Sequence, residues 1–398
     1  MTADSPVVRR APWVSRLRIR GVTEAYSSNY VLLLAITLLL GVIGLVMVLS
    51  SSAIDSYSES DHFFSTFFKQ GFFAIAGIPL MLMVSRMPVS LIRRWAGVFF
   101  LAALALQALV FTPLGYGSGG NRNWIRVGSL SVQPSEVLKV ALLLWLAVVL
   151  ARRPAQLNQL KAIAFPGLIG VALAVGLVLL GHDLGTAMVM LLAVFASLYF
   201  ARVPLRYFVI AGAAAVGGVI VLAVTSPNRM NRIAQFLSPD CTDYLGSCWQ
   251  SVHGTWALAN GGVFGVGLGN SVAKWSWLPA AENDFIFAII GEELGLVGAV
   301  VVFALFLGLA VVFCRIILSA PDSFSRVFVG GVMVWIVGQA FVNMGVVVGV
   351  LPVLGVPLPL ISSGGSALIS ALVAIGLVLA VSRENPTPLV VGTPKEGV

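Results

Sequence analysis

The chain has 398 residues, of which 59% are hydrophobic and only 10% are charged. Soluble domains are about 45–50% apolar and about 25% charged, so this composition excludes an ordinary soluble protein and indicates an integral membrane protein. The formal net charge of +8 would also suit a nucleic-acid-binding protein. However, the basic residues concentrate in alternate loops, which follows the positive-inside rule with both chain ends in the cytoplasm, and we therefore predict no nucleic-acid partner.

Apolar segments long enough to cross about 30 Å of hydrocarbon recur along the chain. We predict ten transmembrane helices, at 30–50, 67–85, 92–112, 135–151, 162–180, 184–201, 206–225, 290–314, 326–350 and 361–382. The predicted fold class is an all-α integral membrane protein with one membrane domain at 30–382 and cytoplasmic tails at 1–29 and 383–398. No cleavable signal peptide is expected, because residues 1–29 are polar and the first apolar segment is long enough to span the membrane.

The outward-facing loop before the fourth predicted helix contains the sequence NRNWIRVGSLSVQPSEVLK. Pro134 is typical of a helix start, so Glu136 and Lys139 fall in the first turns at the i, i+3 spacing where side chains meet. Two interpretations stay open: a salt bridge that anchors the helix end, or a pair that organises a polar cavity with Asp284. Arg122, in the same loop, is a candidate substrate-binding cation.

Further along, Asp183 in GHDLGT is predicted to cap the sixth helix. The longest outward-facing loop follows at 226–283, between helices seven and eight. Its scattered tryptophans favour a loop folded against the membrane surface. Cys241 and Cys248 within it could form a disulfide in an oxidising compartment.

Candidate anion-binding groups also lie in this loop. Two arginines at i, i+3 spacing could clamp an anion, and the glycine-rich run GGVFGVGLGN with the lysine after it could approach a phosphate group. Solvated loop residues are the alternative for both. The candidate substrate-binding residues here are Arg229, Arg232, Gly269, Asn270 and Lys274.

Asp284 lies where the long loop meets the eighth helix, in LPAAENDFIFAIIGEELG. An ionised carboxylate in lipid costs several kcal/mol unless it is paired or hydrated, so Asp284 is a functional candidate. The alternative is an N-cap of that helix. Glu292 and Glu293 lie about 12–13 Å further along the helix, on other faces, so we expect them to support helix packing and not to share a metal with Asp284.

These motifs, together with DLGTA and NMGVVVGVLPVLGVPLPLISSGGS, resemble the SEDS family (shape, elongation, division and sporulation), bacterial membrane proteins that polymerise glycan strands of peptidoglycan. The resemblance covers about residues 30–383. The segment GLGNSVAKWSWLP looks more like division members than elongation members. The chain departs from the common family pattern at Glu282 and Asn283, where His and Thr are frequent, and at Ser363, where an aromatic residue is common.

The resemblance implies an outward-facing glycosyltransferase in the bacterial cytoplasmic membrane that uses lipid II as donor and acceptor. It maps the family's essential aspartate onto Asp284, and its glutamate and lysine onto Glu136 and Lys139. We expect Asp284 to deprotonate the acceptor hydroxyl, directly or through a divalent cation (Mg²⁺ or Mn²⁺), while basic residues neutralise the pyrophosphate.

The expected partners are lipid II, a class B penicillin-binding protein of the FtsI type, divisome regulators and membrane lipid. A lipid II flippase and a non-catalytic divisome scaffold are the alternative functions. We favour the polymerase, because a flippase needs polar groups through the full membrane depth, whereas the informative groups here gather in the outer third.

Overall fold

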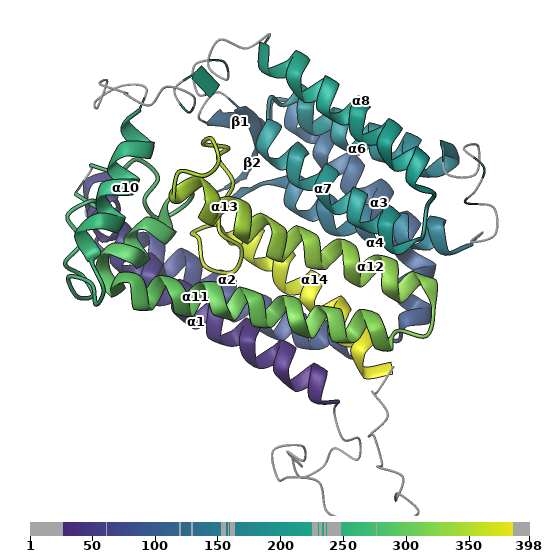
Figure 1. Ribbon diagram of the computed structural model, residues 1–398, viewed down its shortest axis with the longest axis horizontal. Helices are drawn as coiled ribbons and strands as arrows, with labels where there is room; N and C mark the ends of the chain where they lie inside the picture. Colours follow the sequence, from purple (N-terminus) through teal and green to yellow (C-terminus); the bar gives the residue numbers. More distant parts are fainter. Residues whose placement is uncertain are drawn as a thin grey trace, which may run out of the picture.

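A computed structural model describes most of the chain between residues 27 and 384 (Figure 1). The described residues are 27–60, 62–118, 121–128, 130–152, 157, 159, 164–224, 230, 233–234, 236, 248–275 and 277–384. Both predicted tails, apart from a few residues next to the bundle, and the predicted site residues Arg229, Arg232 and Cys241 lie outside this set.

Seven helices in the described part of the chain are long and apolar enough to cross a membrane. They are α1 (Ser28–Ser60), α2 (Ser65–Ser85), α3 (Val89–Ala108), α4 (Pro134–Arg152), α11 (Ile286–Ser319), the continuous α12–η5–α13 (Ser323–Met333, Val334–Gly338 and Gln339–Val347) and α14 (Gly365–Glu384). Three shorter apolar stretches follow α4 in the chain, at Phe165–Leu180, Leu184–Phe200 and Leu205–Gly218. They belong to η4 with α6 (Ala164–Leu168 and Ile169–Leu180), to α7 (Leu184–Phe200) and to α8 (Leu205–Val224). Each of these helices overlaps one predicted span, and the count of ten spans stays a prediction.

The middle of the bundle is formed by α4, α12–α13 and α14. In α4, 78% of the most apolar window is buried inside the protein, against 28% in α2 and in α3. Lipid-facing helices keep an outward apolar face, so the low buried share of α2 and α3 places them at the bundle periphery. Side chains on α4, α12–α13 and α14 are therefore surrounded by protein on most sides.

One segment between α3 and α4 is not helical, which adds a small sheet to the mostly helical fold. Strands β1 (Gly115–Ser118), β2 (Asn121–Val127) and β3 (Leu130–Val132) form an antiparallel sheet in the order β1-β2-β3. Along β2, Asn123 and Ile125 are buried whereas Arg122 and Arg126 are exposed. This alternation has the period of a half-buried strand, and it turns the Asn123 side chain toward the bundle.

The described part of the long loop contains a helix, α10 (Trp249–Gly261), that packs on α11. Figure 1 shows α10, the small sheet and the loop between α13 and α14 at the same end of the bundle, opposite the end from which the two chain termini leave. The predicted site residues in the described part of the chain lie at this end.

Candidate active site

Glu136 and Lys139 form a buried ion pair at the start of α4. Helix α4 begins at Pro134, as predicted, and the Lys139 Nζ lies 2.9 Å from Glu136 Oε1. The two side chains are only 4% and 5% exposed. The ammonium also donates to Gln339 Oε1 at 3.4 Å and lies 4.9 Å from the centre of the Trp335 ring. The predicted salt bridge is confirmed, and its burial shows that it is more than a surface anchor.

A cavity adjoins this ion pair. One wall is formed by Glu136, Trp335 and Gln339, and the facing wall by the loop between α13 and α14 with the start of α14. The loop and α14 residues that line it are Pro357, Leu358, Pro359, Leu360, Ser362, Ser363, Ala367, Leu368 and Ala371. Glu136 is the one acidic residue among the described residues that line this cavity.

Asp284 immediately precedes α11 but does not cap it. The N-cap position belongs to Phe285, without a side-chain capping hydrogen bond, so the capping interpretation of Asp284 is wrong. The Asp284 side chain is half-buried. Its Oδ2 faces the backbone of Gly355, where an added Cβ would lie 3.6 Å away. The carboxyl group thus lies against the same α13–α14 loop that lines the cavity.

Two amides on α13 connect Asp284 to the ion pair. Gln339, which accepts from Lys139, donates through Nε2 to Pro357 O at 2.8 Å. Asn343 donates through Nδ2 to Val356 O and to Asp284 O, both at 2.7 Å. The structure therefore brings the three predicted catalytic residues into one hydrogen-bonded assembly. Sequence analysis missed both amides, although polar side chains at i, i+4 inside an apolar helix are a recognisable signal.

A second carboxylate, Asp183, joins the sheet to the bundle beside this assembly. Its Oδ1 accepts from Thr186 N at 2.9 Å, which confirms the predicted cap of α7. Its Oδ2 accepts from Asn123 Nδ2 at 2.7 Å and from Gln133 Nε2 at 3.3 Å. Asp183 is only 5% exposed. We therefore assign it to holding β2 and the start of α4 against α7.

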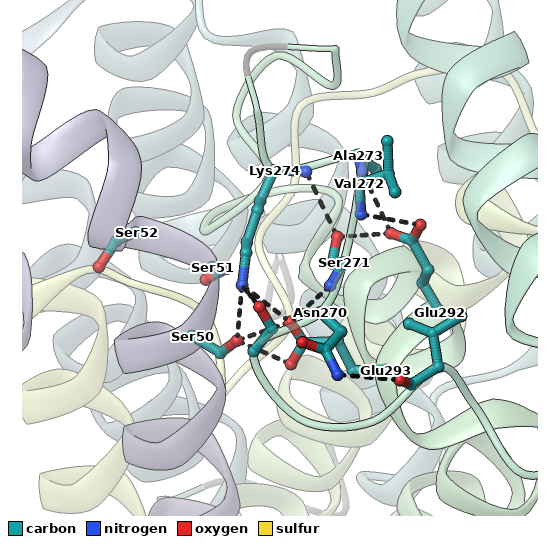
Figure 2. A network of polar contacts seen from close by, with 12 residues as sticks. Ser50, Ser51, Ser52, Asn270, Ser271, Val272, Ala273, Lys274, Glu292 and Glu293 are labelled. Atoms are coloured by element: carbon teal, nitrogen blue, oxygen red, sulfur yellow. Dashed lines mark hydrogen bonds and ion pairs between the residues drawn. The ribbon is translucent and has the colours of Figure 1, made fainter.

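Lys274 does not face the cavity but forms a second buried ion pair (Figure 2). Its Nζ lies 3.3 Å from Glu293 Oε1 and donates to Gly269 O at 2.5 Å. Ser50 of α1 donates to both Glu293 oxygens, at 2.6 and 2.7 Å. Because Lys274 is only 6% exposed and its ammonium is already engaged by Glu293, it could contact a pyrophosphate only by breaking this ion pair.

Glu292 holds the same loop by a separate set of contacts (Figure 2). It accepts from Ser271 Oγ at 2.5 Å, from Asn260 Nδ2 at 2.9 Å and from Val272 N at 3.1 Å. The neighbouring Asn270 is exposed and donates through Nδ2 to Val266 O at 3.1 Å. The expectation that Glu292 and Glu293 support packing is confirmed, since both are 1% exposed and accept hydrogen bonds from this loop and from α10 or α1.

The glycine-rich run docks on a break in α11. Gly295 has a left-handed φ of 69° inside α11. A Cβ on Gly261 would lie 1.9 Å from Gly291 O, and one on Gly265 would lie 2.2 Å from Glu293 O. Val266 N and Gly267 N donate to the carbonyl oxygens of Glu292 and Glu293, both at 3.0 Å. Gly261 and Gly265 are therefore required for close backbone approach. An added Cβ on Gly269 would meet nothing within 4 Å, so a phosphate contact at Gly269 stays a prediction.

The remaining predicted residues are not drawn into the assembly. Arg122 is exposed on β2 and donates to Thr112 O at 2.9 Å. Cys248 is disulfide-bonded and Cys314 is a free thiol. Within the part of the chain that the structure describes, no group of three or more His, Cys, Asp or Glu side chains could hold a metal ion. A divalent cation at Asp284 would thus need backbone, water or substrate oxygens as its other ligands, which Mg²⁺ commonly uses.

A bundle of long apolar helices with buried ion pairs, and with a cavity lined in part by Glu136, defines a multi-pass membrane protein with a polar site. The chain belongs to the FtsW/RodA/SpoVE family of cell cycle proteins, whose model matches residues 30–387.

Relatives and solved structures agree with this assignment. The chain is 39% identical to a probable peptidoglycan glycosyltransferase FtsW of Mycobacterium tuberculosis over 90% of this chain and 68% of that protein. It is 36% identical to stage V sporulation protein E of Bacillus subtilis over 92% of this chain and 100% of that protein. A chain of a peptidoglycan synthase complex that coordinates polymerization and crosslinking superposes with a TM-score of 0.72 at 30% identity, over 91% and 98% of the two chains. The rod shape determining protein RodA of Thermus thermophilus superposes with a TM-score of 0.65 at 29% identity, over 92% and 99%.

Proposed function

We propose that this protein is a peptidoglycan glycosyltransferase of the FtsW type that polymerises lipid II during cell division. Relatives that match nearly the whole chain carry the name of that activity. The observation that carries the proposal is the arrangement of Asp284: a half-buried carboxylate against the loop that forms one wall of a cavity whose other wall presents Glu136. An acceptor sugar bound against the α13–α14 loop would lie beside the Asp284 carboxylate.

In the proposed reaction, Asp284 accepts the proton of the acceptor sugar hydroxyl as its oxygen attacks the anomeric carbon of the donor. The new glycosidic C–O bond forms while the bond from the anomeric carbon to the pyrophosphate oxygen breaks, and the lipid pyrophosphate leaves with the bonding electrons. General-base help of this kind typically contributes about 10²–10⁴-fold. Glu136 and Lys139 hold one wall of the cavity in place. Gln339 connects them to the loop beside Asp284, because it accepts from Lys139 and donates to Pro357 O.

The leaving pyrophosphate needs positive charge. Arg122 is the exposed candidate on the described surface, and Arg229 and Arg232 stay candidates from the sequence. A Mg²⁺ or Mn²⁺ ion held by Asp284 and substrate oxygens would supply further charge when bound.

The proposed topology has ten spans, both chain ends in the cytoplasm and the site facing outward, at the level of lipid headgroups. A crosslinking enzyme of the class B penicillin-binding type is the proposed partner. The similar chain from a complex that coordinates polymerization with crosslinking supports this pairing. Divisome regulators are proposed from the division-type sequence features.

Purified protein incubated with lipid II tests the proposal. We expect glycan strands from the wild type and about 10²-fold less polymer, or a larger loss, from Asp284→Asn. Reactions with and without Mg²⁺ or Mn²⁺ show whether a cation takes part. Lipid II translocation in vesicles without any polymerase separates the flippase alternative. Translocation that survives in Asp284→Asn, together with no polymer from the wild type, would refute the polymerase.

A further inference from the structure

We propose that Asn343 and Ser362 are positioning residues that fix the backbone of Asp284, so that they act on catalysis without touching the substrate. This inference deepens the proposed function and depends on it for its kinetic consequence. Its structural consequence can be measured independently of activity.

Three successive carbonyl oxygens before α11 each accept a hydrogen bond from another part of the chain. Ser363 N donates to Glu282 O at 2.8 Å. Ser362 Oγ donates to Asn283 O at 2.6 Å, and Asn343 Nδ2 donates to Asp284 O at 2.7 Å. Because every peptide unit from 282 to 284 is held from outside, the backbone that carries the Asp284 side chain has little freedom to rotate. We call these three hydrogen bonds the carbonyl clamp.

The Asn343 side of the clamp is rigid. Asn343 is 1% exposed, and its two amide protons serve Asp284 O and Val356 O at 2.7 Å each. A side-chain amide has two donor hydrogens, so both are committed. Two carbonyl acceptors also determine which atom is the nitrogen, since the opposite orientation would set oxygen against oxygen. Asn343 therefore ties the aspartate to the α13–α14 loop.

The Ser362 side is equally constrained. Ser362 is 7% exposed, and its Oγ accepts from Leu358 N at 2.8 Å while it donates to Asn283 O. Gln70 of α2 holds the same turn, through Nε2 to Ser362 O at 3.2 Å and through Oε1 from Gly364 N at 3.1 Å. The turn is thus held by α2. The Ser362 hydroxyl, which both accepts and donates a hydrogen bond, links this turn to the loop that contains Asp284.

The clamp also relates Asp284 to the cavity. Ser362 and Ser363 belong to the cavity wall, and their donor groups hold the peptide units on either side of Asn283. Glu282, Asn283 and Ser363 contribute only backbone atoms to the clamp. The side chains at the positions where this chain departs from the family pattern therefore do not enter the clamp.

The experiment uses the full chain with two clamp variants, Asn343→Leu and Ser362→Ala. The matched controls are Gln107→Leu in α3 and Ser197→Ala in α7, which remove a buried amide and a buried hydroxyl away from the clamp. Gln107 is 1% exposed. Ser197 Oγ donates only within its own helix, to Ala193 O at 3.1 Å. A displacement of about 1 Å at a reacting group can cost about 10²-fold. We expect kcat for lipid II polymerisation to fall about 10–100-fold in both clamp variants, with KM within about 3-fold of wild type, and the conservative Asn343→Gln to recover part of the loss.

Hydrogen exchange supplies a readout that does not need activity. Asn283 N and Phe285 N donate to Ala280 O at 3.0 and 3.3 Å inside the clamped loop. These amides should exchange at least about tenfold faster in the clamp variants, because losing a hydrogen bond of about 1.4 kcal/mol raises the population of the open loop about tenfold. The control variants should exchange them at the wild-type rate.

Unchanged exchange in both clamp variants, or a kcat per folded molecule equal to that of the controls, would overturn the clamp. Faster exchange with an inactive wild type would refute the proposed function and leave the clamp supported.

Discussion

The ion pair between Lys274 and Glu293 gives the sharpest stability prediction. The two side chains are 7% and 0% exposed, and the pair joins the loop after α10 to α11 and, through Ser50, to α1. Removing one partner of a buried ion pair leaves an uncompensated charge and typically costs about 3–5 kcal/mol. Glu293→Gln should fall in that range, since the Lys274 ammonium would keep only neutral acceptors, Gly269 O and Ser50 Oγ.

Lys274→Met should cost less than Glu293→Gln. Without the lysine, Glu293 still accepts from Ser50 Oγ at 2.6 Å and from Ser271 N at 3.4 Å. Hydrogen bonds to a charged group contribute about 1.5–3 kcal/mol each, so part of the carboxylate's stabilisation remains. We expect a loss of about 2–3 kcal/mol, below the about 3–5 kcal/mol typical of a broken buried pair.

The double variant Lys274→Met/Glu293→Gln tests whether charge pairing is the cause. With both charges removed, the loss should be smaller than the sum of the single losses by about 2 kcal/mol, a coupling expected only for groups in direct contact. Denaturant titration of the purified protein in mixed micelles, followed by the fluorescence of its tryptophans, measures all three variants. Additive single losses would refute the ion-pair argument and leave only loss of packing.

The remaining predictions concern the cavity and the glycine run. Asp284→Asn should lower the rate of lipid II polymerisation about 10²-fold or more at unchanged stability. A gel assay of the glycan chains measures this loss. Chains made at the wild-type rate would show that Asp284 is not the base of the proposed reaction. Glu136→Gln should destabilise the protein by about 3–5 kcal/mol, because the Lys139 ammonium stays buried without its counter-charge. A midpoint of denaturant unfolding equal to that of the wild type would contradict this prediction. Gly265→Ala should destabilise the protein by about 1–3 kcal/mol, because φ is +81° and the new Cβ would meet Glu293 O. Gly217→Ala in α8, with nothing within 4 Å of the added carbon, is its control and should be neutral or slightly stabilising.

Local sequence was sufficient for the features that depend on neighbouring residues. The apolar segments placed the helices, Pro134 placed the start of α4, and the i, i+3 spacing placed Glu136 beside Lys139 at 2.9 Å. Asp183 was recognised as the cap of α7. Each of these features is decided within one or two helical turns, so no distant part of the chain is needed to predict it.

Features that join distant segments could not be predicted in this way. The partner of Lys274 was expected to be a phosphate, but the folded chain supplies Glu293, 19 residues on, with Ser50 of α1 beside it. A basic side chain in a loop carries no record of which carboxylate will be buried next to it. The glycine run likewise suits a nest or a close backbone contact, and only the folded chain shows that Gly261 and Gly265 make the close contact with α11.

The sequence by itself determined that the chain is an apolar helical membrane protein, which family motifs it carries and which carboxylates deserve attention. Only the tertiary structure decided that Asn343 and Ser362 hold the backbone before Asp284, and that Lys274 is part of the scaffold. The physical reason is that hydrophobic periodicity and capping are local properties, whereas a buried polar group is satisfied by whichever donor or acceptor the packing of remote helices brings to it.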